Sequence, residues 1–85
     1  MDEEKLRKNL AKNMRYLRKQ RSPRMSQTML ANKLEVTQKS ISRYENEVTL
    51  PPLHILAGLA EYFGISMDDL LSAELPGRKG RKENE

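Results

Sequence analysis

Large apolar residues recur every three or four positions through most of this chain, which is the spacing that places side chains on one face of an α-helix. The first run consists of Leu6, Leu10, Met14 and Leu17. Basic residues fill many of the positions between them, namely Arg7, Lys8, Lys12, Arg15, Arg18 and Lys19. We therefore predict a basic amphipathic helix. Ser22 and Pro23 interrupt it, because proline disfavours helix in the preceding residue and lacks a backbone donor.

Two short helices are predicted next, each preceded by a hydroxyl side chain that can cap it. Ser26 precedes the first, a helix of about eight residues. Its inward residues are expected to be Met29 or Leu30, Ala31 and Leu34. Thr37 precedes the second, whose inward side is the narrow stripe of Ile41 and Tyr44. Only about three residues join the two helices, which is helix-turn-helix geometry.

The rest of the chain predicts a fourth and a fifth helix. Pro51 and Pro52 suit the entry of the fourth helix, since a helix tolerates proline in its first turn, and Gly64 suits its end. Its inward residues are expected to be Leu53, Leu56, Ala60 and Phe63. Ser66 and Asp69 form a capping pattern for a last short helix that contains two leucines. These helices predict an all-α fold.

We expect one domain over residues 1–75 and a basic, disordered tail over residues 76–85, which contain no large apolar residue. At 85 residues and 36% hydrophobic content, the chain has material for one small core, so its function should lie on the surface. The lack of cysteine excludes a disulfide scaffold, a thiolate zinc site and a cysteine nucleophile.

Other function classes are also disfavoured. The single histidine and the scattered carboxylates suggest no converging catalytic or metal-binding group, so we expect neither enzyme activity nor a cofactor. No stretch approaches the ~20 apolar residues that span a membrane, and the N-terminus is polar. We expect a cytoplasmic protein.

Charge is distributed unevenly along the chain, whose formal net charge is +4. Residues 1–25 contain nine Lys and Arg against three acidic residues, whereas residues 47–75 contain five acidic residues and no Lys or Arg. This asymmetry indicates a polyanion bound on one side of the protein. An ordinary solvated helix face would also account for the basic residues.

The third predicted helix carries side chains that are able to read DNA. An α-helix fits the major groove when it presents amide and cationic groups that match the base edges. Gln38, Lys39 and Arg43 meet this description, since glutamine pairs with adenine while lysine and arginine pair with guanine. The same residues would also suit a solvated helix with no ligand.

Residues 25–71 contain a set of short motifs that follow one another in a fixed order. The motifs are Met25-Ser26-Gln27, Leu30-Ala31, Leu34, Val36-Thr37-Gln38, Ser40-Ile41-Ser42-Arg43, Tyr44-Glu45-Asn46, Pro51, Leu53, Leu56, Ala60, Phe63-Gly64-Ile65-Ser66 and Asp69-Leu70-Leu71. Together they resemble the Cro and lambdoid-repressor type of helix-turn-helix, also called the xenobiotic-response-element family. The resemblance covers residues 6–71.

This resemblance implies a five-helix, lambda-repressor-like domain that regulates transcription. By default it implies a repressor that binds double-stranded DNA as a homodimer. It implies base contacts by Gln38, Lys39 and Arg43. It implies phosphate contacts by Gln27, Thr37, Ser42 and Asn46. Gln27 would also brace the first residue of the recognition helix, and Arg18 and Glu45 would form a structural salt bridge.

Three departures from the family pattern stand out. Glu35 occupies a turn position where the family usually has glycine with a positive φ, which leaves the shape of the turn open. Glu47 replaces another frequent glycine and would place a carboxylate on the phosphate side. Pro23 and Arg24 look like an insertion before the second helix.

A second class of function stays open from the sequence. The chain would then be an antitoxin-like module that binds DNA weakly and holds a protein partner through its acidic second half. The basic residues of the tail would either follow phosphates or keep the chain end soluble.

Overall fold

The structure, a computed structural model, describes residues 2–75. These residues form five α-helices and no strand: α1 (Glu3–Gln20), α2 (Gln27–Leu34), α3 (Gln38–Glu45), α4 (Leu53–Phe63) and α5 (Met67–Leu70). The predicted all-α, five-helix fold is confirmed. The predicted tail, residues 76–85, lies outside the described residues.

The helices begin where their capping residues predict. Ser26 Oγ accepts a hydrogen bond from the Met29 N–H (3.0 Å), and Thr37 Oγ1 accepts one from the Ser40 N–H (3.1 Å). Ser66 Oγ caps α5 in the same way. Each side chain satisfies a backbone donor that the first turn of a helix leaves without a partner.

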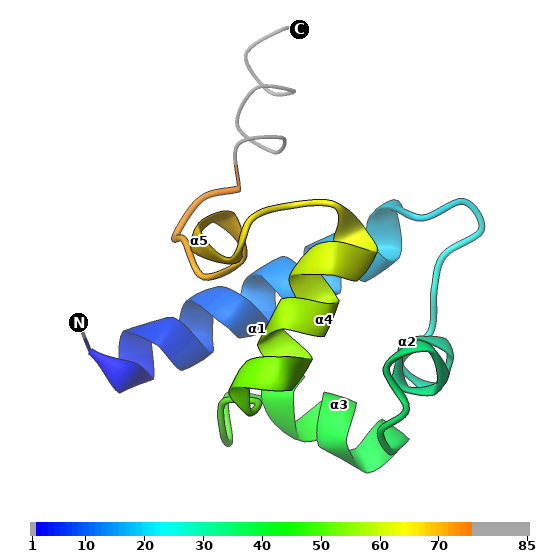
Figure 1. The fold of residues 1–85 in the computed structure, drawn as a ribbon, viewed down its shortest axis with the longest axis horizontal. Coiled ribbons are helices and arrows are strands. Elements are labelled where there is room, and N and C mark those ends of the chain that lie inside the picture. Colours follow the sequence, from blue (N-terminus) through cyan, green and yellow to red (C-terminus); the bar gives the residue numbers. More distant parts are fainter. Residues whose placement is uncertain (1, 76–85) are drawn as a thin grey trace, which may run out of the picture.

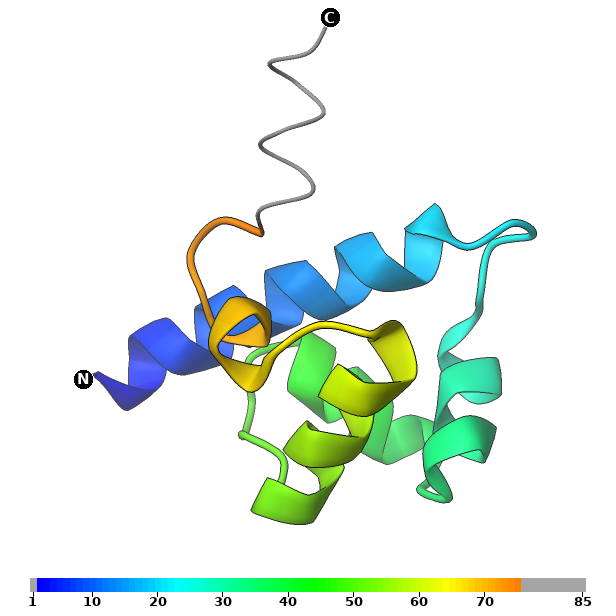
Figure 2. The ribbon, with the colours of Figure 1, turned by 45° about the horizontal axis from the view of Figure 1, so that its top comes forward.

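The helices pack around one core. Its largest fully buried apolar side chains are Leu10, Met14, Leu30, Ile41, Leu59 and Leu70. α1 runs along the molecule with α5 beside it, and α2 and α3 are neighbours joined by a short turn (Figures 1 and 2). The Asn13 side chain of α1 is fully buried and donates to the Leu70 and Ser72 carbonyls, both at 2.8 Å, which fastens the end of α5 to α1.

The predicted inward face of α4 is wrong at its first position. Leu53 is 71% exposed, and the buried residues of this helix are Ile55, Leu59 and Ala60. Leu53 is the first residue of α4. Because helical side chains point toward the N-terminus of their helix, the Leu53 side chain projects past the packed part.

The turn between α2 and α3 keeps a backbone shape typical of glycine, although Glu35 occupies it. Glu35 ends α2 with φ 59° and ψ 42°, in the left-handed region. The Val36 N–H donates to the Ala31 carbonyl (3.0 Å), as expected where a helix ends on a left-handed residue. Glu47 adopts the same kind of conformation, with φ 64°, just after α3.

Glu35→Gly is therefore expected to stabilise the protein. A left-handed conformation costs a non-glycine residue roughly 1–2 kcal/mol, and the added freedom of glycine in the unfolded chain offsets part of the gain. We expect the free energy of unfolding in urea to rise by about 0.5–1 kcal/mol. The matched control is Lys33→Gly inside α2, which should lose about 1 kcal/mol. Equal losses in both variants would show that Glu35 is not strained.

Candidate nucleic-acid interface

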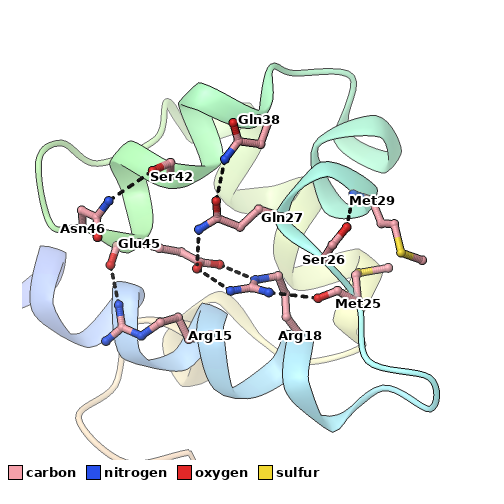
Figure 3. Close-up of polar contacts among 10 residues, drawn as sticks. All are labelled: Arg15, Arg18, Met25, Ser26, Gln27, Met29, Gln38, Ser42, Glu45 and Asn46. Atoms are coloured by element: carbon pink, nitrogen blue, oxygen red, sulfur yellow. Dashed lines mark hydrogen bonds and ion pairs between the residues drawn. The ribbon is translucent and has the colours of Figure 1, made fainter.

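A buried ion pair fastens α3 to α1. Arg18 of α1 donates through Nε to Glu45 Oε2 and through Nη2 to Glu45 Oε1, both at 2.7 Å. Its Nη1 donates to the Met25 carbonyl at 2.9 Å, so the loop before α2 is held as well. Arg18 is 9% exposed and Glu45 is 2% exposed. One guanidinium group thus joins three segments of the chain beneath α3 (Figure 3).

A second arginine of α1 reaches the end of α3. Arg15 Nη1 donates to the backbone carbonyl of Glu45, the last residue of α3 (Figure 3). Cations are favourable at this end of a helix, where backbone carbonyls lack partners within the helix. In the sequence, Arg15 is one of several basic residues of the first predicted helix. No local pattern identifies this role, because it depends on how α1 and α3 pack.

Gln27, the first residue of α2, connects the ion pair to the start of α3. Its Nε2 donates to Glu45 Oε1 at 3.0 Å, and its Oε1 accepts a hydrogen bond from Gln38 Nε2 at 2.7 Å. Gln27 is half-buried, whereas Gln38 is exposed. The structure therefore brings the expected bracing residue and the first residue of α3 into direct contact.

The two sides of α3 differ in chemistry. Ile41, Tyr44 and Glu45 are buried, which fixes one side of the helix against the core. Lys39 and Arg43 are exposed and lie one turn apart, close to the exposed Gln38. Glu45 is the only carboxylate in α3, and it points inward to Arg18. The outward side of α3 is therefore neutral or cationic.

The other expected phosphate-contacting residues flank this surface. Asn46 Nδ2 donates to Ser42 Oγ at 3.1 Å, so these two side chains lie together at the end of α3 (Figure 3). The Thr37 hydroxyl accepts from the Ser40 N–H and donates to Ser40 Oγ at 3.0 Å. Thr37 thus acts first as the cap that begins α3.

One cation of the basic N-terminal half packs against α4. The Arg21 guanidinium lies 4.7 Å from the ring centroid of Tyr62 and 5.1 Å from that of Phe63, and Nη2 donates to the Tyr62 carbonyl at 3.2 Å. This cation packs on α4, where it gains from the aromatic faces. The charge count alone does not reveal this contact with α4.

Within residues 2–75, no three His, Asp or Glu side chains form a group that could hold a metal ion. No helix among these residues is both long enough and apolar enough to cross a membrane.

The helix-turn-helix family model matches residues 14–70, about two thirds of the chain, from the middle of α1 to the end of α5. No curated protein and no solved structure matches the chain.

Proposed function

The chain belongs to the Cro and lambdoid-repressor type of helix-turn-helix family, and on this premise we propose that it is a sequence-specific, DNA-binding regulator of transcription. The observation that carries the proposal is the two-sided chemistry of α3. Its inner side is fixed by buried residues, and its outer side presents amide and cationic groups with no carboxylate. A helix with this character suits the major groove.

The roles of the residues follow from this docking. Gln38, Lys39 and Arg43 would contact base edges, because they stand on the outer side of α3. The polar groups around them would contact phosphates, and these residues are Gln27, Thr37, Ser42 and Asn46. Phosphate contacts fix the register of the helix in the groove, and base contacts determine which sequence is bound.

We further propose that the protein acts as a homodimer on a two-fold operator and represses transcription by occluding a promoter. One recognition helix spans only a few base pairs, so tight binding calls for two half-sites. The centres of these half-sites would lie about 34 Å, or roughly 10 base pairs, apart. This action needs no cofactor, and it would take place in the cytoplasm.

Binding is expected to depend steeply on salt. Each phosphate that a lysine or arginine neutralises releases counterions, so log K should fall linearly with log salt, at about −0.9 per phosphate. The measurement is fluorescence anisotropy of a labelled duplex between low and physiological salt. A flat response would contradict the assignment of the basic side as the DNA-facing surface.

A further inference from the structure

The basic residues of α1 and its C-terminal cap fall into two classes. Each arginine of residues 3–21 has a partner within the protein: Arg7 pairs with Glu3 at 3.2 Å, and the other three contact α3 or α4. The lysines of α1 are all exposed, and within residues 2–75 none of their side chains forms an ion pair or a hydrogen bond. These lysines, the lysine stripe, are Lys5, Lys8, Lys12 and Lys19.

The lysine stripe runs straight along the outer side of α1. Because an α-helix turns by about 100° per residue, the four positions lie within roughly 60° of one another around the helix axis. With a rise of about 1.5 Å per residue, they extend over about 21 Å. Leu10, Asn13 and Met14 are buried on the opposite side of the helix. After Glu4, α1 contains no carboxylate that would offset the charge of the stripe.

The lysine stripe and the outer side of α3 face different directions. Arg15 and Arg18 contact Glu45, so they mark the side of α1 that faces α3. The stripe lies roughly a quarter turn from that side and points away from the core. The buried residues of α3 face the core and α1, so the outer side of α3 points away from α1. Figure 2 shows α1 along one edge of the molecule, with the other helices packed on one side of it. A duplex docked on α3 would therefore leave the stripe exposed.

The lysine stripe suits a phosphate backbone better than a protein surface. Lysine is a compact charge on a flexible stem, which pairs with phosphate as a point charge. Duplex DNA presents one negative charge per about 1.7 Å of its axis, so a row of lysines meets phosphates wherever it lands. The centre of a protein interface is instead apolar. The exposed large apolar residues of the described chain are Met29, Val48 and Leu53, and none of them lies on α1.

The acidic half of a second copy matches the lysine stripe less well than DNA does. Within residues 47–75, the exposed carboxylates lie on separate segments: the loop after α3, α4, α5 and the segment after α5. They belong to Glu47, Glu61, Asp68 and Glu74. Carboxylates that are separated in this way do not form a row opposite a straight line of lysines.

We propose that the lysine stripe binds the phosphate backbone of a second DNA duplex, so that the protein bridges two duplexes. The inference rests on the proposed function, which places the first duplex on the outer side of α3. Binding at the stripe is independent of base sequence, because phosphate contacts carry no sequence information. The protein thus holds its selected sequence against any neighbouring DNA.

The test measures how much of a labelled, scrambled duplex the full-length protein captures on beads that carry the selected duplex. Wild-type protein should link the two duplexes at low salt. The slope of log K for capture against log salt should be about −0.9 for each lysine engaged, or about −3.6 for all four. Replacing the whole stripe should reduce capture by about tenfold or more and leave the affinity for the bead duplex unchanged. This variant is Lys5→Gln/Lys8→Gln/Lys12→Gln/Lys19→Gln.

Two control variants separate the lysine stripe from the overall charge. Replacement of the same four lysines by arginine keeps the charge and should keep the capture. A second variant removes four positive charges from residues 76–85 and should also keep it. This variant is Arg78→Gln/Lys79→Gln/Arg81→Gln/Lys82→Gln. An equal loss of capture in the second variant would attribute the capture to net charge and overturn the proposal. Glutamine has nearly the helix propensity of lysine, so α1 should persist without the stripe.

The remaining outcomes distinguish this proposal from the proposed function. If the wild-type protein selects a sequence but captures no second duplex, the proposed function stands and this proposal fails. It also fails if the glutamine variant of the stripe binds the bead duplex more weakly, since the stripe would then contact the first duplex. Association of protein copies without DNA, lost in that variant, would assign the stripe to a second copy instead. If no sequence is selected, the proposed function fails, and stripe-dependent capture between two scrambled duplexes would still support the stripe as a DNA-binding surface.

Discussion

Glu45→Ala is expected to lower the free energy of unfolding by about 3–5 kcal/mol. The substitution leaves the Arg18 guanidinium buried without its carboxylate and removes the acceptor for Gln27. A loss of this size approaches the whole stability of many small domains, so much of the variant should be unfolded at 37 °C. Urea unfolding followed by circular dichroism measures the difference.

Arg18→Met/Glu45→Leu is the matched control for this loss. It removes both charges together and fills their space with apolar groups, an exchange that is often neutral or stabilising. We therefore expect the double variant to be far more stable than Glu45→Ala. If Glu45→Ala cost less than about 1 kcal/mol, as is typical of exposed ion pairs, the ion pair would not hold α3 to α1.

The second large effect is expected on DNA binding. Gln38→Ala and Arg43→Ala should each reduce discrimination between the selected duplex and a scrambled one by about 1–3 kcal/mol. The combined variant should lose roughly 2–6 kcal/mol if the two contacts are independent. Both side chains are exposed, so the fold should be little affected. Binding to the two duplexes at one salt concentration measures the ratio.

Asn46→Ala serves as the control for base readout. Asn46 is proposed to contact a phosphate, so its substitution should weaken binding to the selected and to the scrambled duplex to a similar extent. The proposed docking of α3 would be contradicted if Asn46→Ala changed the specificity. It would also be contradicted if Gln38→Ala and Arg43→Ala weakened binding to all sequences alike.

Much of the fold could be predicted from local chemistry. Ser26, Thr37 and Ser66 precede helices because their hydroxyl groups satisfy backbone donors within the next three residues. Gly64 ends α4 in the left-handed conformation, which glycine adopts without strain. Such signals involve neighbours in the sequence, so a single chain displays them. The family resemblance, based on an ordered set of motifs, is likewise confirmed by the family match.

Other features depend on how the helices pack, so they could not be predicted from the sequence. Leu53 has an apolar side chain at helical spacing, yet it lies beyond the packed part of α4. Arg15 and Arg21 look alike in the sequence, but the first contacts the end of α3 and the second packs on aromatic rings of α4. The turn at Glu35 keeps its shape because tertiary packing outweighs a local cost of roughly 1–2 kcal/mol.

In the candidate site, too, some features could be predicted from the sequence and others depend on packing. The outward position of Gln38, Lys39 and Arg43 follows from the helical phase of Ile41 and Tyr44, which the sequence already contains. The hydrogen bond from Gln27 to Glu45 joins residues 18 positions apart and needs the ion pair beneath it. This contact is therefore visible only in three dimensions.

Selection of bound duplexes from a random pool tests the central claim most directly, with wild-type protein and with Gln38→Ala/Arg43→Ala side by side. We predict that the wild-type protein enriches an inverted repeat with half-site centres roughly 10 base pairs apart, and that the variant loses it. Weak binding with no enriched sequence would contradict a sequence-specific regulator and would favour a module whose main task is to hold a protein partner.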